Sequence, residues 1–216
     1  MAAREAIAAR QSKGIADLGQ LSAAPATYAL IAVTVFVSLY AFYAGAKFID
    51  EFSCRAGEIT MRRGHHRLIT SALLHADPFH LALNMLTFYS FGPAVEQLLG
   101  KIGLLVLYVG SAIAGGLMIK LNNRNNPNYA AIGASGAVSG VILAYCLFFP
   151  LAKVYLLGLP FGMPAVLFAL LYAALSMHLM RAPGRIISHE GHLGGALGGV
   201  ILTVLMKPEI ISKAMG

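Results

Sequence analysis

Residues 127–152 read PNYAAIGASGAVSGVILAYCLFFPLA, a stretch of 26 residues without a charged side chain. A helix that crosses the ~30 Å hydrocarbon core of a bilayer needs about 20 apolar residues, so this stretch is long enough to span a membrane. Ser135 lies within it and is therefore expected at membrane depth. Because polar side chains there are costly to desolvate, they tend to face a protein interior or a wet cavity and to serve a function.

The composition of the whole chain also favours a membrane protein. Of its 216 residues, 58% are hydrophobic and 12% are charged, about half of the ~25% charged share of ordinary globular proteins. The formal net charge is +7, but no Lys/Arg cluster alternates with aromatic residues, which argues against nucleic acid as a partner. Basic loops beside the headgroups of a lipid bilayer explain this charge better.

Cutting the chain at its charged residues gives six candidate membrane helices. The first begins near Pro25 or Thr27, and Asp77 followed by Pro78 is typical of a helix start. The long connection of residues 47–77 is expected to fold on itself. The fifth helix is expected to begin at Gly162 or Met163, after a stretch broken by glycine and proline. The candidate spans cover about residues 25–47, 78–96, 101–120, 127–152, 162–181 and 186–206.

The sequence therefore predicts an all-α, polytopic membrane protein with one domain. Residues 1–24 form an N-terminal tail that is expected to be cytoplasmic, with a mitochondrial presequence or an amphipathic surface helix as the alternatives. Residues 25–206 form the six-span bundle, and residues 207–216 form a short C-terminal tail. The basic residues are split seven against nine between the two sides, so the positive-inside rule does not decide the orientation.

The cysteine and histidine residues do not suggest a metal or a cofactor. The two cysteines have no metal-ligand spacing. His189 and His192 share one element, but no cysteine or carboxylate completes a ligand set with them. No metal and no cofactor is therefore expected. His189 and Glu190 are predicted to be solvated loop residues, and His178 is predicted to be a buried hydrogen-bonding residue.

Two polar residues lie one helical turn apart near the start of the second candidate span. His80 and Asn84 are separated by four positions, so their side chains project from one face of a helix. They can present two hydrogen-bond donors to one point. The alternative is that nearby loop carbonyls satisfy both side chains, as is common at helix ends.

Ser135 has small neighbours that suit either catalysis or packing. Gly133 and Gly136 let a loop or a substrate backbone approach the Ser135 hydroxyl closely. Near a helix N-terminus, free backbone N–H groups and the helix dipole favour the negative charge of a tetrahedral oxyanion. The alternative is helix packing, because Gly136 and Gly140 are small residues spaced by four.

A second glycine face follows His192 in the last candidate span, where Gly195 and Gly199 are again spaced by four. If the glycine faces of residues 127–152 and 186–206 meet, the two helices come within backbone contact. His192 then comes within hydrogen-bond reach of Ser135. The packing and catalytic interpretations support each other.

Three motifs together resemble the rhomboid family of intramembrane serine proteases. They are His80-x-x-x-Asn84, Gly133-Ala134-Ser135-Gly136 and His192-x-x-Gly195-x-x-x-Gly199, which occur in the family's order on the second, fourth and sixth spans. Residues 66–75 are also similar to the family's first loop running into its second span. The resemblance covers roughly residues 60–206.

The resemblance implies a six-transmembrane-helix rhomboid-like bundle with a Ser135–His192 dyad and no acidic third residue. His192 would take the Ser135 proton as general base and later return it to the leaving amine. His80, Asn84 and the Ser135 backbone N–H would form the oxyanion hole. The implied substrates are single-span transmembrane proteins whose helix unwinds near the cut, within the lipid bilayer. The turns at residues 158–164 and 181–189 are candidates for the segment that moves to open the cavity around Ser135.

One position near the nucleophile departs from the family's pattern. An aromatic residue often lies four residues after the nucleophile and packs on the histidine, but that position is Ser139 here. Some other group is therefore expected to orient His192.

Two other function classes compete with proteolysis for this sequence. A rhomboid-like scaffold would bind transmembrane helices without cutting them, but it would be favoured by loss of Ser135 or His192, and both are present. A transporter would usually need charged or repeated elements at mid-membrane, which this chain lacks. The expected location is the bacterial plasma (inner) membrane, with the mitochondrial inner membrane as the alternative.

Overall fold

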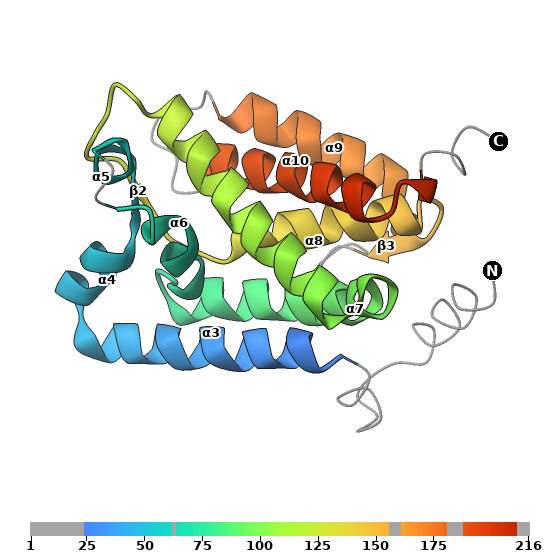
Figure 1. The fold of residues 1–216 in the computed structure, drawn as a ribbon, viewed down its shortest axis with the longest axis horizontal. Coiled ribbons are helices and arrows are strands. Elements are labelled where there is room, and N and C mark those ends of the chain that lie inside the picture. Colours follow the sequence, from blue (N-terminus) through green and yellow to red (C-terminus); the bar gives the residue numbers. More distant parts are fainter. Residues whose placement is uncertain (1–23, 62–63, 156–160, 181–187, 211–216) are drawn as a thin grey trace.

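The computed structural model describes residues 24–61, 64–155, 161–180 and 188–210, and over these ranges the chain is mainly helical (Figure 1). This agrees with the all-α prediction. The helices are α3 (Pro25–Ala44), α4 (Ala46–Phe52), α5 (Ala56–Thr60), α6 (Arg67–Thr70), the 3-10 turn η1 (Ser71–Leu73), α7 (Pro78–Asn122), α8 (Ser135–Phe148), α9 (Ala165–Leu179) and α10 (His189–Met206). The strands are β1 (Cys54–Arg55), β2 (Ala130–Ala131), β3 (Lys153–Tyr155) and β4 (Gly162–Pro164), which pair as two antiparallel ribbons, β1 with β2 and β3 with β4.

Helix α7 is two helices that meet at a break. Gly100 has φ 75° and ψ 169°, a backbone conformation that favours glycine because it has no Cβ. The break leaves helical segments at 78–99 and 101–122, which match the predicted second and third spans. Asp77 begins the first segment as predicted, since its carboxylate accepts a hydrogen bond from the His80 backbone N–H at 2.8 Å and Pro78 occupies the first turn.

The length of each helix decides which of them can cross a bilayer. Among the described residues, α3 and α7 are long and apolar enough to do so by length and composition. Helices α8 and α9 are apolar but shorter. The count of six spans therefore stays a prediction.

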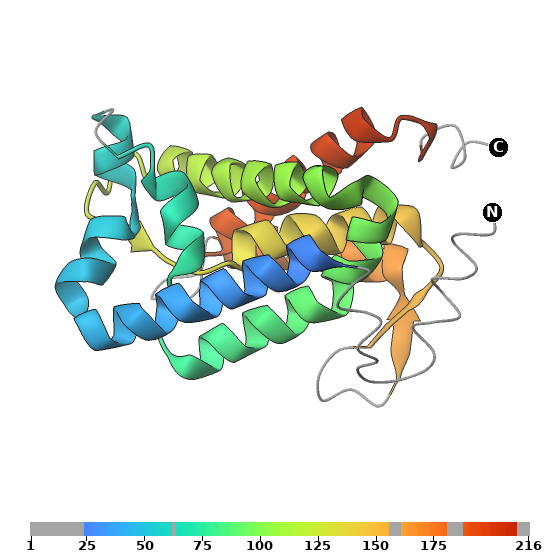
Figure 2. The same cartoon turned by 60° about the horizontal axis from the view of Figure 1, so that its bottom comes forward.

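Helix α8 lies inside the bundle. Of its 14 residues, 11 are buried, and it contacts α7, α9 and α10 (Figure 2). A helix that is apolar on all sides is typical of a protein core. The uncharged stretch that contains Ser135 therefore forms a buried helix of the bundle. By contrast, only Ala165 and Ser176 are buried in the 15 residues of α9.

A buried carboxylate from α7 caps the N-terminus of α3. Glu96 is 3% exposed and accepts hydrogen bonds from the backbone N–H groups of Ala26 at 2.9 Å and Thr27 at 2.7 Å. The Thr27 hydroxyl donates to the same carboxylate at 2.7 Å. Since the first N–H groups of a helix have no intrahelical acceptor, Glu96 serves as their cap from a neighbouring helix.

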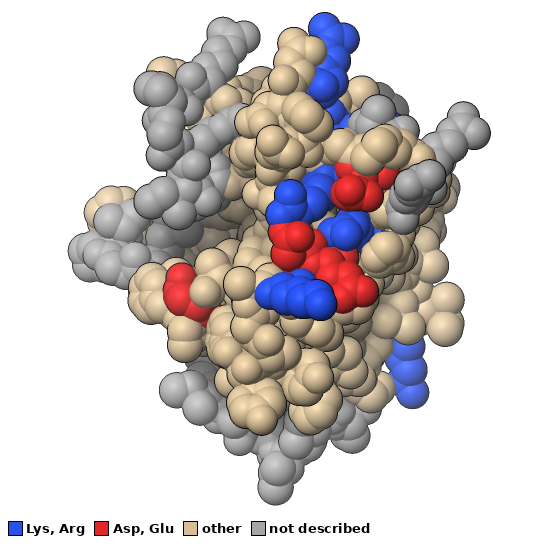
Figure 3. Space-filling model, turned by 90° about the vertical axis from the view of Figure 1, so that its left-hand side faces the viewer, with Lys and Arg blue, Asp and Glu red and all other residues tan. Residues whose placement is uncertain are grey.

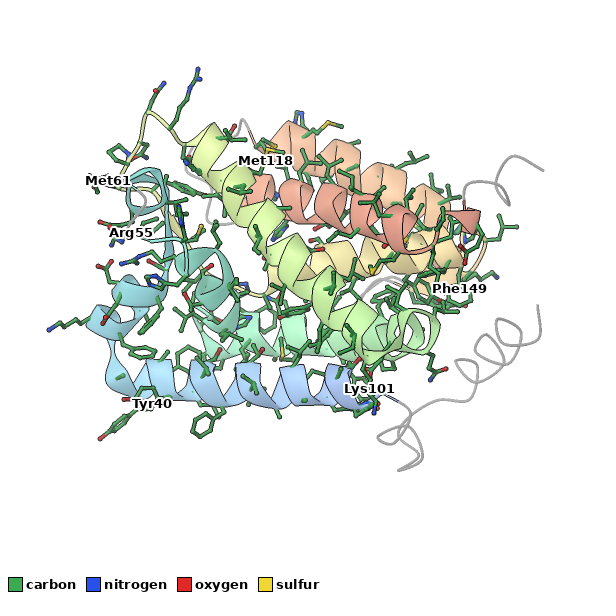
Figure 4. All side chains as sticks on the ribbon, viewed as in Figure 1. Tyr40, Arg55, Met61, Lys101, Met118 and Phe149 are labelled. Carbon is green, nitrogen blue, oxygen red and sulfur yellow. The ribbon has the colours of Figure 1, made fainter. Side chains whose placement is uncertain are left out.

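The connection between α3 and α7 folds on itself, as predicted, into α4, β1, α5, α6 and η1. Arg67 donates to the backbone carbonyl groups of Asp50 at 2.6 Å and Ser53 at 3.1 Å, and Arg55 pairs with the Asp50 carboxylate. Charged side chains gather on this side of the molecule (Figure 3). Figure 4 labels Arg55 at this end and Lys101 and Phe149 at the other.

Two sequence expectations for the fifth span are wrong. Residues 162–164 pair with 153–155 as β4 and β3, so α9 begins at Ala165 rather than at Gly162 or Met163. His178 is exposed rather than buried, because α9 lies at the periphery and presents most of its side chains outward.

Candidate active site

One cavity of about 560 Å³ lies between the start of α7, strand β2, and helices α8, α9 and α10. Ser135, His192, His80 and Asn84 all line it. The structure therefore brings together, from three helices, the four residues that the motifs single out.

Ser135 is the first residue of α8, and this position leaves backbone donors free. The N–H groups of residues 135–137 precede the first intrahelical bond, which runs from Val138 N to Ala134 O at 2.9 Å, and no side chain in the described part of the chain caps this end. The positive end of the helix dipole lies at the same point. A group that develops negative charge beside Ser135 would meet both.

Gly133 fixes the approach to Ser135. Its φ of 129° is a conformation that L side chains rarely adopt, and a Cβ there would lie 2.8 Å from Cε1 of His80. Only glycine lets the loop before Ser135 pass this close to the imidazole.

Asn84 keeps one donor for the cavity. One N–H of its side-chain amide donates to the His80 carbonyl group at 3.0 Å. Because an amide carries two donors, the second remains available beside the Ser135 end of α8.

His192 lies in the first turn of α10, which begins after Ser188. The Ser188 hydroxyl accepts from the Gly191 backbone N–H at 3.4 Å. Glu190 is fully buried and accepts a hydrogen bond from the Asn123 side chain at 2.8 Å, which joins the start of α10 to the end of α7. The expectation that His189 and Glu190 are solvated loop residues is wrong, because both belong to α10 and Glu190 is the partner of a buried amide.

The glycine faces of α8 and α10 meet at backbone distance. A Cβ on Gly195 would collide with the Gly136 carbonyl group, and a Cβ on Gly199 would collide with the backbone of Gly140. A Cβ on Gly136 would lie 3.1 Å from a carbonyl oxygen of α10, that of Gly191. Side chains at these positions would push apart the two helices that carry Ser135 and His192.

His75, a buried loop residue, links α3 to the residue before Ser135. The Ser38 hydroxyl donates to the Leu73 carbonyl at 2.8 Å and lies 2.9 Å from His75 Nδ1, while Nε2 accepts from the Ala134 N–H at 3.3 Å. Since the only hydroxyl proton of Ser38 is already donated, Nδ1 carries the ring proton and donates to Ser38. Burial lowers the pKa of His75 to about 4, which keeps the ring neutral in this tautomer. The sequence motifs give no role to this residue.

Tyr172 of α9 lies against His192 and was not found from the sequence. The two rings are nearly parallel, with an interplanar angle of 15° and centroids 6.4 Å apart. The Tyr172 hydroxyl is hydrogen-bonded to Ser139, which donates to the Ser135 carbonyl group at 2.6 Å. No local pattern in residues 165–179 marks this tyrosine, because its role depends on how α9 faces α10.

Within the described residues, no hydrogen bond joins the Ser135 hydroxyl to the His192 ring, although both line the cavity. Catalytic hydrogen bonds are often long in unliganded enzymes and tighten when substrate binds.

Within the described residues, no group of three His, Cys, Asp or Glu side chains is arranged to hold a metal ion. Of the two turns that are candidates for opening the cavity, residues 158–160 and 181–187 lie outside the described residues, whereas residues 162–164 form β4.

Comparison with known families decides the family of the chain. The family model described as "Rhomboid domain" matches residues 62–209. The chain belongs to the rhomboid family. It is therefore a membrane protein, and the three motifs all fall within the matched rhomboid domain.

Curated rhomboid relatives come from bacteria and from mitochondria. The chain is 35% identical over 139 residues to "Putative rhomboid protease YdcA" of Bacillus subtilis, covering 64% of this chain and 66% of that protein. It is 32% identical over 143 residues to "Rhomboid protein 1, mitochondrial" of Saccharomyces cerevisiae, covering 62% and 40% of the two chains. It is 31% identical over 137 residues to "Presenilin-associated rhomboid-like protein A, mitochondrial" of Danio rerio, covering 62% and 35%. The rhomboid chain thus spans about a third to two thirds of the length of these relatives.

Proposed function

We propose that this chain is an intramembrane serine endopeptidase that cuts transmembrane segments of single-span membrane proteins. The observation that supports it most is the cavity in which Ser135, His192, His80 and Asn84 lie together. The rhomboid domain and the protease-named bacterial relative agree with this function.

The proposed reaction uses Ser135 as nucleophile and His192 as general base. His192 accepts the Ser135 proton while Oγ attacks the peptide carbonyl carbon, and the carbonyl oxygen becomes an oxyanion. His80, Asn84 and the Ser135 backbone N–H donate to that oxyanion. His192 then gives the proton to the leaving amine. In the second half of the reaction His192 takes a proton from a water that attacks the acyl carbonyl carbon, and it returns this proton to Ser135 Oγ as the acyl group leaves.

The length of α8 supports a reaction below the membrane surface. Its 14 residues extend for about 21 Å, less than the ~30 Å hydrocarbon core that a six-span bundle would cross. A cavity at its first residue admits water to that depth. Because the peptide bonds of an intact helix are shielded by its own hydrogen bonds, the substrate helix unwinds locally before it is cut.

The proposed location is the bacterial plasma membrane, with the mitochondrial inner membrane as the alternative. The relative from Bacillus subtilis agrees with the first location, and the relatives whose names say mitochondrial agree with the second. The proposed partners are the lipid bilayer and single-span substrates.

Labelling of the nucleophile tests the dyad. The full chain is purified in detergent and treated with a fluorophosphonate probe, with Ser135→Ala and His192→Ala beside the wild type. Both variants are expected to lose labelling. Ser90→Ala is the matched control, because the Ser90 hydroxyl is bonded to the Leu86 carbonyl on an exposed part of α7. Equal labelling of the wild type and both dyad variants contradicts the proposal.

Cleavage of a single-span reporter in proteoliposomes then separates a protease from a scaffold. A protease cuts the reporter in a Ser135-dependent manner, whereas a rhomboid-like scaffold binds it intact. Asn84→Ala is expected to slow cutting by about a hundredfold, since one oxyanion donor typically contributes about 3 kcal/mol to the barrier. If the Asn84→Ala variant cuts at the wild-type rate, Asn84 is not a donor of the oxyanion hole.

A further inference from the structure

The aromatic partner of His192 comes from a different helix than the family pattern suggests. Position 139, four residues after Ser135, is a serine. The structure fills the space beside the imidazole with the ring of Tyr172, from α9, which lies at 15° to the His192 ring. A flat ring contact restricts the rotation of an imidazole about its terminal torsion, which is otherwise broad.

The hydrogen bonds of Ser139 show which hydroxyl donates in its contact with Tyr172. Ser139 donates its hydroxyl proton to the Ser135 carbonyl group at 2.6 Å. A hydroxyl has one proton, so in the bond between Ser139 and Tyr172 the tyrosine is the donor. A chain of two directed hydrogen bonds therefore runs from Tyr172 through Ser139 to the backbone of the nucleophile itself.

A second ring, on α9 itself, also contacts Tyr172. Phe168, one turn earlier, lies at 29° to the Tyr172 ring with centroids 5.9 Å apart. Tyr172 is thus held by Phe168 on its own helix, by Ser139 on α8 and by His192 on α10. These contacts connect α9 to the site through one side chain, although most of the helix is exposed.

We propose that Tyr172 is the positioning residue of His192, and that Ser139 holds its hydroxyl in place of an aromatic side chain on α8. This inference rests on the proposed function of Ser135 and His192. Tyr172 contacts the base and takes no part in proton transfer. Its ring keeps the imidazole plane aligned, and its hydroxyl fixes the ring relative to Ser135.

The test compares two reactions of the full chain in detergent, fluorophosphonate labelling of Ser135 and cleavage of a single-span peptide reporter. The probe needs an aligned base but occupies little of the cavity, whereas the reporter needs both the base and the cavity walls. Since aromatic pairs account for about two- to tenfold in an equilibrium or a rate, Tyr172→Leu is expected to lower the labelling rate and the reporter kcat together, by about tenfold. The reporter KM is expected to change by less than about twofold.

Conservative variants keep the test valid if Tyr172→Leu loosens the fold, which thermal unfolding measures. Tyr172→Phe keeps the ring and is expected to retain at least about a third of the wild-type rate, because it loses only the hydroxyl contact. Ser139→Ala removes the other end of that contact. The double variant is expected to be no slower than the slower single variant. Leu175→Ala, on an exposed part of α9, is the matched control and is expected to label at the wild-type rate.

Three outcomes overturn the inference. Wild-type labelling of Tyr172→Leu with a raised reporter KM would make Tyr172 a wall of the substrate cavity only. A Tyr172→Phe enzyme as slow as Tyr172→Leu would assign the effect to the hydroxyl instead of the ring. A wild-type chain that neither labels nor cuts overturns the proposed function itself, and that result is visible before any Tyr172 variant is compared.

Discussion

Helices α10 and α9 both contact α8, and they do so in opposite ways. Gly195 and Gly199 of α10 bring its backbone against that of α8, so no side chain separates the helices that carry His192 and Ser135. Helix α9 reaches the site through the side chain of Tyr172, and 13 of its 15 residues are not buried.

The difference shows how one site combines a fixed part and an adjustable part. A backbone contact leaves no side chain that can rotate away, so the spacing of α8 and α10 is set by van der Waals contact between the two backbones. A side-chain contact can be made and lost by rotating a few torsions. Substitutions at the first interface should therefore act on the fold, and substitutions on α9 should act on the alignment of the base or have no effect.

The largest effect is expected at the α8–α10 interface. Gly195→Ala places a methyl group against the Gly136 carbonyl group, and backbone atoms on both sides prevent relief. Overpacking of this kind costs about 1–3 kcal/mol and occasionally more, so we expect a fall of about 3 kcal/mol in unfolding free energy and loss of fluorophosphonate labelling. Thermal unfolding in detergent and labelling measure the two effects.

Gly110→Ala is the matched control for this substitution. A Cβ there meets only the end of the Leu202 side chain, which can rotate. Because alanine favours a helix over glycine by up to about 1 kcal/mol, this variant should be neutral or slightly stabilised. Equal losses in Gly195→Ala and Gly110→Ala would show that backbone contact does not set the spacing of these helices.

An intermediate effect is expected at His75, which holds the loop before Ser135. The pKa of His75 is lowered to about 4 from its ordinary value of about 6.5. The neutral ring therefore contributes stability that is fully present above pH 6.5 and is lost as the pH falls toward and through 4. Between pH 7 and pH 4 the wild-type Tm should fall by about 5 °C more than that of His75→Gln.

The comparison with His75→Gln isolates one titration, because the other histidines are common to both proteins. Parallel Tm curves for the wild type and the variant would mean that His75 is protonated equally well in the folded and unfolded chain. The hydrogen bond from Ala134 to Nε2 would then not hold the loop.

The smallest effect is expected on the outer face of α9. Leu175 is 57% exposed, so Leu175→Ala removes few protein contacts. The change in unfolding free energy should stay within about 0.5 kcal/mol, and the labelling rate should be unchanged. A loss above about 2 kcal/mol in thermal unfolding would mean that this face packs against protein, for example a second copy of the chain.

The sequence alone predicts those features whose residues lie close together in the chain. His80 and Asn84 share a face because four residues make about one turn, and the small residues after Ser135 and His192 indicate close helix contact by their spacing alone. The break in residues 78–122 also agrees with the sequence prediction, which ends the second span near Glu96 and begins the third at Lys101 because both residues are charged.

The sequence was insufficient where a partner lies on another element. Glu190 looks like a solvated residue by its charge, and only the position of Asn123 at the end of α7 explains its burial. An apolar run predicts a buried His178, but α9 lies at the periphery and His178 is exposed. The contacts of Tyr172 depend on how α8, α9 and α10 are placed against one another, and no local sequence pattern encodes that placement.

The cap that Glu96 provides for α3 has a consequence for how the chain is made. Helix α3 is synthesised before α7, yet the acceptor for its opening N–H group at Ala26 comes 70 residues later. A carboxylate without a partner is costly in lipid, so Glu96 and the start of α3 each gain by meeting as soon as both have left the ribosome. Pairing of α3 with the first half of α7 is therefore favoured as the earliest step of assembly, before the helices that carry Ser135 and His192 exist.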